Sequence, residues 1–139
     1  MVDRAVVAEK IASVRDAVAR IRDVLPAARD AFRADRTVRE VVILNLFVAL
    51  QECLSLAAHW LSDAGLDVPQ SDAQVFLRLG ERGIVAPDLA ARLAAASGLR
   101  NLVAHRYGVL DWDRIHELAS TQLDDLLAFC ETLARKVSS

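Results

Sequence analysis

The polar residues best suited to chemistry lie close together near residue 100. Arg100 is followed after four residues by His105, and Tyr107 comes one residue later, which gives the pattern R-x4-H-x-Y. Histidine titrates near neutral pH and serves as a general acid or base. Arginine carries a fixed positive charge that stabilises negative charge as it builds up on a phosphate. These residue types suit cleavage of a phosphate ester that carries its own nucleophile, as RNA does with its 2′-hydroxyl, without a cofactor.

A structural role for the same residues is the alternative. Histidine near the C-terminus of a helix interacts favourably with the helix dipole, and arginine often binds the last carbonyl groups there. A tyrosine before a terminating glycine, as in Tyr107-Gly108, can simply pack on the next helix. Residue types alone leave both roles open.

The spacing of Arg100 and His105 raises a geometric problem. Five residues along an α-helix correspond to a rise of roughly 7.5 Å and a rotation of about 140°. The two side chains therefore do not stack on one face of a straight helix. Either the helix loosens before Gly108, the long arginine side chain bridges the gap, or two subunits complete one another's site.

A second set of polar residues interrupts the most apolar part of the chain. Asn45, Glu52 and His59 are spaced by seven residues, so they drift only about 20° per step and share one helix face. Buried polar groups need partners. One interpretation is a supporting set in which Glu52 pairs with Arg100. The others are a structural polar seam at a helix–helix or dimer contact, and a metal site at Glu52 and His59, whose i,i+7 spacing is not typical of helical zinc sites. His116 is expected at the surface.

The composition predicts that helices position these residues. The chain has 139 residues, of which 54% are hydrophobic and only 5% aromatic. Its core must therefore be filled with alanine, leucine, valine and isoleucine, which favours packed helices over a β-sandwich. Five glycines and three prolines are too few to turn many short strands. We expect a single all-α domain over residues 1–139.

Apolar periodicity and capping residues predict where the helices lie. Capping boxes are expected at Thr37 with Glu40 and at Ser71 with Gln74, and Asp111 is expected to cap the last helix. The loops are short, so neighbouring helices should be antiparallel. The predicted fold is an up-and-down four-helix bundle with an additional short helix. The predicted ranges are Asp3–Leu25, Ala28–Ala34, Thr37–Ala64, Ser71–Gly83, Pro87–Tyr107 and Trp112–Val137.

The motif at the predicted helix end resembles the signature of the HEPN superfamily, and the added tyrosine resembles its HepT-like branch. The likeness extends to the apolar second helix and to the stretch VFLRLGERGIVAPDLAARLAAASGLRNLVAHRY, and it covers nearly the whole chain. The resemblance implies a metal-independent ribonuclease toxin of a type VII-like toxin–antitoxin pair. It also implies a homodimer in which both motifs face a shared cleft, which favours the third geometric solution.

The chemistry of the residue types suggests a role for each residue of the motif. His105 would be the acid or base and Arg100 the clamp on the transition state. Asn101 would orient the phosphate or the histidine, and Tyr107 would hydrogen-bond the RNA substrate. The resemblance further implies an MntA-type nucleotidyltransferase antitoxin that transfers AMP onto Tyr107 and thereby silences the toxin.

Other functions and the remaining bulk properties limit the interpretation. A non-catalytic HEPN module that binds a nucleotidyltransferase partner or a nucleotide is the main alternative, and a purely structural helical dimer is a third. The net charge of −2 leaves RNA binding undecided. We expect a cytoplasmic protein without membrane contact, because no export signal is recognisable and the run Val41–Leu50 is too short to span a bilayer. Cys53 and Cys130 are expected as buried free thiols. No metal or cofactor is expected.

Overall fold

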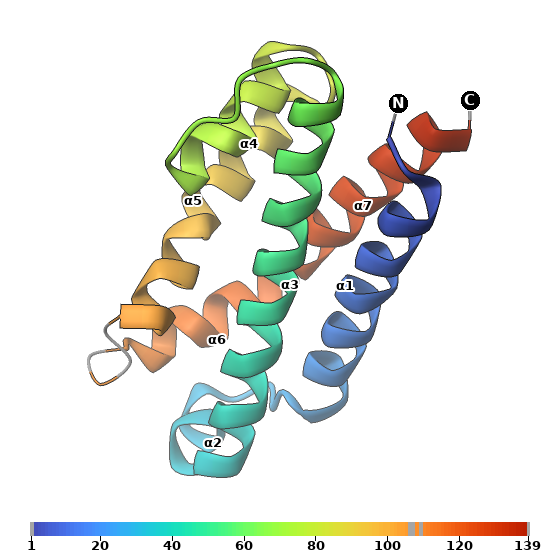
Figure 1. Cartoon of the computed structure of the whole chain (residues 1–139). Coiled ribbons are helices and arrows are strands. Elements are labelled where there is room, and N and C mark those ends of the chain that lie inside the picture. Colours follow the sequence, from blue (N-terminus) through green and yellow to red (C-terminus); the bar gives the residue numbers. More distant parts are fainter. Residues whose placement is uncertain (1, 106–107, 109, 139) are drawn as a thin grey trace.

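The computed structural model of the chain describes residues 2–105, 108 and 110–138, without the side chains of residues 104 and 105. Within these residues the structure has seven helices and no strand (Figure 1). The predicted all-α bundle with a short extra helix is confirmed. The helices are α1 (Arg4–Val24), α2 (Arg29–Ala34), α3 (Arg36–Asp63), α4 (Asp72–Glu81), α5 (Pro87–His105), α6 (Trp112–Thr121) and α7 (Leu123–Ser138).

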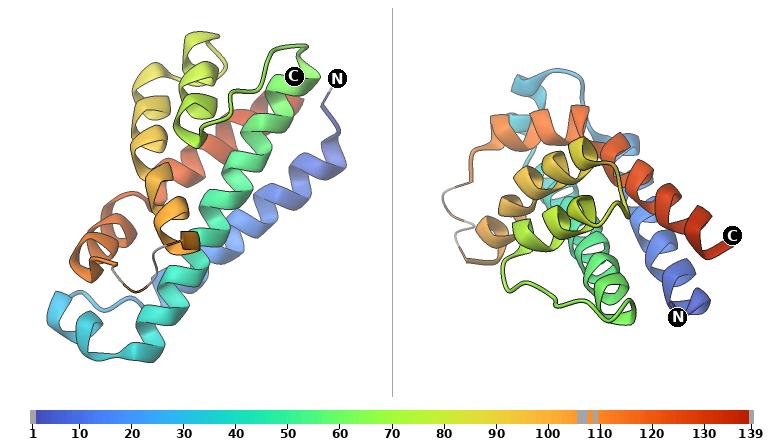
Figure 2. Two further views of the ribbon diagram at one scale, coloured as in Figure 1. Left: turned by 60° about the vertical axis from the view of Figure 1, so that its left-hand side comes forward. Right: turned by 90° about the horizontal axis from the view of Figure 1, so that it is seen from above.

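Helix α3 is the centre of the bundle. It packs against all six other helices, as its nearly continuous apolar sequence predicts. Helices α1 and α7, from the two ends of the chain, lie side by side against one flank of α3, and the antiparallel pair α4 and α5 lies against another (Figure 2). Helices α2 and α6 contact each other near the N-terminal end of α3. This arrangement brings the start of α4 and the last turns of α5 close to the middle of α3.

The start of α3 differs from the prediction. The N-cap is Asp35, whose carboxylate accepts a hydrogen bond from the backbone N–H of Val38 at 3.1 Å. The predicted capping box at Thr37 and Glu40 is therefore wrong. An aspartate two residues earlier satisfies the free N–H groups first, and Glu40 instead accepts a hydrogen bond from Arg36 Nε at 2.9 Å.

Three other predicted helix ends are confirmed. The Ser71 hydroxyl accepts a hydrogen bond from the backbone N–H of Gln74 at 3.2 Å, and Asp111 caps α6. Gly65 follows the end of α3 with a φ of +74°, a conformation that glycine adopts without strain. The start of α4 is thus defined by a serine cap, which matters for the site described below.

The prediction of a single helix over Trp112–Val137 is wrong, because the helix is interrupted at Gln122. This residue has φ −110° and ψ 0°, and it separates α6 from α7. Just before the break, Ser120 and Thr121 donate side-chain hydrogen bonds to carbonyl groups one turn earlier, at 2.7 and 2.8 Å. Such bonds compete with the helical pattern and bend helices. The break lets α6 pack on α2 while α7 packs on α1.

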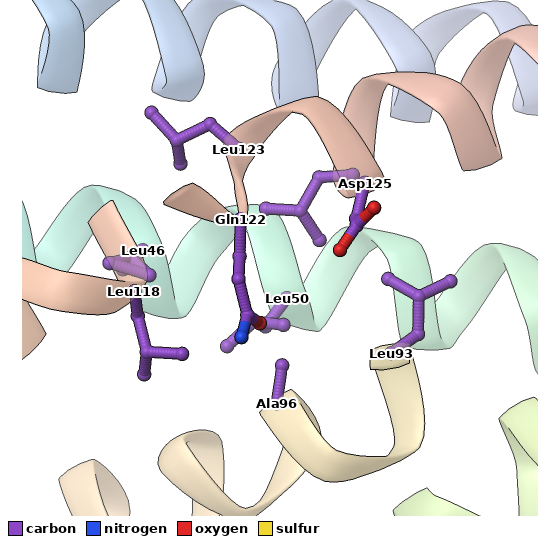
Figure 3. Close-up of a pocket in the computed structure, with 9 residues that line it drawn as sticks. Leu46, Leu50, Leu93, Ala96, Leu118, Gln122, Leu123 and Asp125 are labelled. Atoms are coloured by element: carbon purple, nitrogen blue, oxygen red, sulfur yellow. The ribbon is translucent and has the colours of Figure 1, made fainter. Parts of the chain in front are cut away.

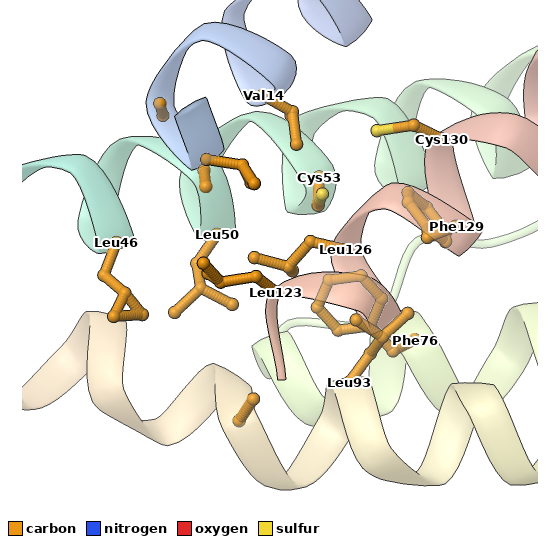
Figure 4. Close-up of a cluster of buried hydrophobic side chains, with 14 of the residues drawn as sticks. Val14, Leu46, Leu50, Cys53, Phe76, Leu93, Leu123, Leu126, Phe129 and Cys130 are labelled. Atoms are coloured by element: carbon orange, nitrogen blue, oxygen red, sulfur yellow. The ribbon is translucent and has the colours of Figure 1, made fainter. Parts of the chain in front are cut away.

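The two cysteines lie in the core, as predicted. Cys53 of α3 and Cys130 of α7 are buried free thiols (Figure 4). Beside them the rings of Phe76 and Phe129 meet edge to face, with centroids 5.7 Å apart. A hydrogen bond with Cys130 and burial raise the pKa of the Cys53 thiol well above its usual range. A thiol in this setting packs as a small apolar group rather than acting as a nucleophile.

His116 is buried, which contradicts its predicted surface position. Only 6% of the residue is exposed, and its Nε2 lies 2.8 Å from the carbonyl oxygen of Pro26. Its ring also contacts that of Phe32, with centroids 5.4 Å apart. The histidine therefore joins α6 to the segment after α1, a contact between residues 90 positions apart.

The close approach of α4 and α5 gives a test of the packing. A Cβ atom on Gly80 would lie 2.8 Å from the Cβ of Ala90, whereas one on Gly98 would meet nothing within 4 Å. We expect Gly80→Ala to lower the free energy of unfolding by about 1 kcal/mol, because overpacking outweighs the better helix propensity of alanine. The control Gly98→Ala should raise it by up to about 1 kcal/mol.

Urea unfolding of both variants at equal protein concentration measures these changes. Stabilisation of similar size in both variants would contradict the close α4–α5 contact.

Candidate functional site

The motif residues lie at the C-terminal end of α5. Arg100 and Asn101 are in its last two turns, and His105 is its last described residue. Tyr107 lies outside the described residues, as does the side chain of His105. The backbone is α-helical at every position from 100 to 105, so the helix does not loosen between Arg100 and His105. The rotation of about 140° between the two positions therefore holds.

Three hydrogen bonds hold the Arg100 guanidinium in place. Its Nε and Nη2 donate to the two carboxylate oxygens of Asp72 at 2.8 and 3.2 Å. Its Nη1 donates to the side-chain oxygen of Gln51 at 2.7 Å. The side chains of Arg100 and Asp72 are 28% and 23% exposed. Residues from α3, α4 and α5 thus meet at one half-buried arginine.

The predicted pairing of Glu52 with Arg100 is wrong. Successive residues of an α-helix are rotated by about 100°, and this step turns Gln51 toward α5 but Glu52 toward α1. There the Glu52 carboxylate lies 3.6 Å from Nζ of Lys10. The chain therefore uses the neighbouring amide, which carries no charge, as the partner of Arg100 on α3.

The other polar residues of α3 also find partners elsewhere. The Asn45 amide donates a hydrogen bond to the carbonyl oxygen of Val41 at 2.8 Å, within the helix. Nε2 of His59 lies 3.1 Å from a carboxylate oxygen of Asp63, although the angle is not that of a hydrogen bond. Among the described side chains, no group of three His, Cys, Asp or Glu residues is placed to hold a metal ion. These contacts fit a polar seam along α3 better than a set gathered around Arg100.

A surface groove adjoins Arg100 between the start of α4 and the second half of α5. Small residues of α5 line one side of it, and polar residues at the start of α4 line the other. Asn101, which is exposed, lies on its edge. Its lining residues are Gln70, Ser71, Asp72, Ala73, Ala94, Ala95, Ser97, Gly98, Arg100 and Asn101.

A separate cavity lies inside the bundle, between α3, α5 and the α6–α7 break (Figure 3). Its volume is about 10 Å³, and leucines such as Leu46, Leu50 and Leu93 make up most of its lining. A space of this size and apolar character is a packing gap rather than a substrate site. The open groove beside Arg100 is therefore the candidate site.

An apolar stripe of α3 leads along the surface to Gln51. Val41, Leu44, Val48 and Gln51 recur at spacings of three and four, so they share one face. Leu44 is 61% exposed, and Val41 and Val48 are half-buried. By length and composition α3 could cross a membrane, a test that core helices of globular proteins also pass, yet only 44% of its most apolar window is buried. Within the described part of the chain, Leu44 is thus left exposed, and Val41 and Val48 are only partly covered.

Comparison with known proteins gives consistent matches over most of the chain. Residues 14–133 match the protein family described as Ribonuclease HepT-like. The chain is 29% identical over 102 residues to the mRNA nuclease HepT of Shewanella oneidensis. The aligned segment covers 73% of this chain and 77% of that protein.

Solved structures match over a larger share of the chain. One is a tri-AMPylated Shewanella oneidensis HEPN toxin in complex with MNT antitoxin, with a TM-score of 0.87 and 27% identity over 96% of this chain and 99% of that one. A toxin–antitoxin structure with AMP-PNP also has a TM-score of 0.87, with 26% identity over 95% of this chain and 99% of that one. The family match over residues 14–133 spans the positions of Gln51, Asp72 and Arg100.

Proposed function

The chain belongs to the HepT-like ribonuclease family, and we propose that it is the ribonuclease toxin of a toxin–antitoxin pair. It cleaves RNA without a metal ion, through Arg100 and His105. The observation that carries this proposal is the Arg100 guanidinium, which is held beside an open groove on the same helix as His105. A fixed cation beside a groove, together with a histidine, suits phosphate chemistry.

The reaction requires only groups that the RNA and the protein supply. The 2′-hydroxyl attacks the neighbouring phosphorus while its proton passes to His105. The bond from phosphorus to the 5′-oxygen breaks, and that oxygen takes up a proton. Arg100 stabilises the negative charge on the phosphate in the transition state. Asn101 orients the phosphate and Tyr107 hydrogen-bonds the substrate, whereas Glu52 and His59 support the site only through the polar seam of α3.

We propose that the active form is a homodimer with one shared cleft. Arg100 and His105 leave α5 about 140° apart, so one subunit alone presents them in different directions. The partly exposed apolar stripe of α3 ends at Gln51, a partner of Arg100, and supplies a surface for a second copy. Two copies of the site also bring two Arg100 guanidinium groups to the cleft, each with N–H donors for RNA phosphate.

We further propose a cytoplasmic partner of the MntA type. The Shewanella toxin that this chain resembles is AMPylated and bound to an MNT antitoxin. Transfer of AMP from ATP to the Tyr107 hydroxyl forms a phosphodiester bond and releases pyrophosphate, and it places phosphate oxygens two residues after His105. Their negative charge occupies the place of the RNA phosphate near Arg100 and repels it. The modification thus turns the proposed nuclease off without unfolding it.

Cleavage by His105 is the first test. Induced expression of the wild type, without antitoxin, should stop growth and degrade RNA, because His105 transfers the proton. In purified protein, His105→Ala should lower the cleavage rate by about 10²- to 10⁴-fold, the usual contribution of a general acid or base. Circular dichroism serves as the control that the variant is folded. If both folded proteins leave growth and RNA intact, a module that binds a nucleotidyltransferase becomes the better interpretation.

A mixing experiment tests the shared cleft. Arg100→Ala and His105→Ala, each measured alone, should cleave RNA far more slowly than the wild type. Their mixture should recover about a quarter of wild-type activity, because half of the dimers are mixed and each of those holds one intact site built from both subunits.

Substitutions at exposed apolar residues test whether the apolar stripe of α3 is the dimer interface. Leu44→Asp should convert the dimer to a monomer in sedimentation measurements, whereas Val24→Asp should leave it unchanged. Val24 is a suitable control because it is an exposed apolar residue at the end of α1, 38% exposed. Mixed dimers that form but stay inactive would contradict a site shared between subunits.

The modification is tested on the only tyrosine of the chain. Co-expression with a nucleotidyltransferase encoded beside the gene should add AMP to the wild type, as seen by mass spectrometry. Tyr107→Phe should receive none, because it lacks the accepting hydroxyl. Its RNA cleavage, weakened by the lost hydrogen bond to the substrate, should be the same with and without the antitoxin. Equal modification of both proteins would show that another residue is the target.

A further inference from the structure

After its contacts with the other described residues, the Arg100 guanidinium has two N–H groups left over. An arginine side chain offers five N–H donors in a planar fork. Asp72 accepts two of them and Gln51 accepts one. Since Arg100 is 28% exposed and lines the groove, the remaining donors are available to a phosphate without breaking these contacts.

We propose that Asp72 is a positioning residue of the active site, which holds the Arg100 guanidinium in the orientation from which it receives the RNA phosphate. A carboxylate that binds the Nε and Nη2 edge in a bidentate manner defines both the position and the plane of the guanidinium. Gln51 restrains the same group from another helix. The inference rests on the proposed ribonuclease function, and adds a residue that the R-x4-H-x-Y pattern does not contain.

The fold places Asp72 on a rigid element. It is the first residue of α4, directly after the serine that caps this helix. An acidic residue in the first turn also interacts favourably with the helix dipole. The close contact of α4 with α5 at Gly80 and Ala90 sets the separation of the two helices. A carboxylate held in this way positions its partner more accurately than one on a loop.

The alternative is that Asp72 competes with RNA for Arg100 and restrains the enzyme. Two observations favour positioning. The Asp72 carboxylate occupies one edge of the fork and leaves donors free, so the phosphate has no need to displace it. The second partner is the amide of Gln51, which adds no negative charge next to the arginine. The two ideas predict opposite changes in activity when the carboxylate is removed.

Asp72→Asn tests the proposal on the purified, full-length protein with an RNA substrate. A misplaced catalytic group costs up to about 100-fold in rate, so we expect kcat to fall by about 10- to 100-fold. The KM should change much less, because the loss falls on the transition state. Asp72→Glu, which keeps the carboxylate, should recover part of the rate.

Asp88→Asn is the matched control. Asp88 also lies in the first turn of a helix, and its carboxylate is 3.5 Å from an arginine one turn later, Arg92. Asp88 lies on the same helix as Arg100 but 12 residues earlier, about 18 Å along the helix axis, and neither Asp88 nor Arg92 lines the groove. The control therefore removes the same charge and the same helix-dipole interaction, and its kcat should equal that of the wild type.

A double-mutant cycle separates positioning from a general effect on structure. In an Arg100→Lys background, which keeps the charge but not the fork, Asp72→Asn should cause little further loss of kcat. Should Asp72→Asn fail to fold in circular dichroism, Asp72→Glu and Gln51→Ala carry the test, with a smaller loss of kcat expected for each.

The outcomes separate the role of Asp72 from the ribonuclease function on which it rests. Wild-type kcat in folded Asp72→Asn, a rise in kcat, or losses that simply add in the cycle would overturn the role of Asp72 alone. A wild type that leaves RNA intact would overturn the ribonuclease function and the role of Asp72 together.

Discussion

The structure depends on the burial of α3, a helix that is apolar on nearly every side. Such a helix must be covered all round, and a chain of 139 residues has few helices with which to cover it. Helices α1 and α7 cover one flank, α4 and α5 another, and α2 and α6 its beginning. The stripe from Val41 to Gln51 is left exposed or half-buried. The same constraint therefore explains the bundle and supports the proposed dimer.

The few polar residues of α3 acquire their importance from this setting. An amide at position 51 costs little in water but needs a partner when half-buried. It finds this partner in Arg100, whose charge is balanced in turn by Asp72. Each member of this group satisfies another, and the three come from three different helices. A polar network of this kind is stable only when the helices are fully packed, which couples the geometry of the site to that of the core.

Local signals in the sequence predicted much of the fold. The helix ends at Gly65, Ser71, Pro87 and Asp111 depend on neighbouring residues, and all four are confirmed. Two other features were missed for physical reasons. The cap of α3 is the earlier of two suitable residues, and the break at Gln122 serves packing of α6 and α7 on different helices.

The site could be predicted only in part. The segment from Arg100 to Tyr107 is visible in the sequence because polar residues cluster in an apolar chain. The sequence does not show that Gln51, rather than Glu52, is the partner of Arg100. A helix that is apolar on nearly all sides lacks a single apolar face that would indicate which residues point toward α5. Asp72 lies 28 residues before Arg100, and only the packing of α4 against α5 brings them together. Helix caps can be predicted from adjacent residues, whereas contacts between helices give no such local signal in the sequence.

The helical geometry of α5 links the proposed chemistry to the proposed assembly. Positions 100 and 105 of this regular helix are rotated by about 140° about its axis, and no local adjustment of the backbone between them removes this difference. A phosphate that contacts Arg100 in the groove therefore needs its acid or base from elsewhere, unless the arginine moves. Asp72 and Gln51 oppose such movement, because they hold the guanidinium on two sides. The more firmly Arg100 is held, the more the reaction depends on the His105 of a second subunit, and the apolar stripe of α3 gives that subunit a place to bind.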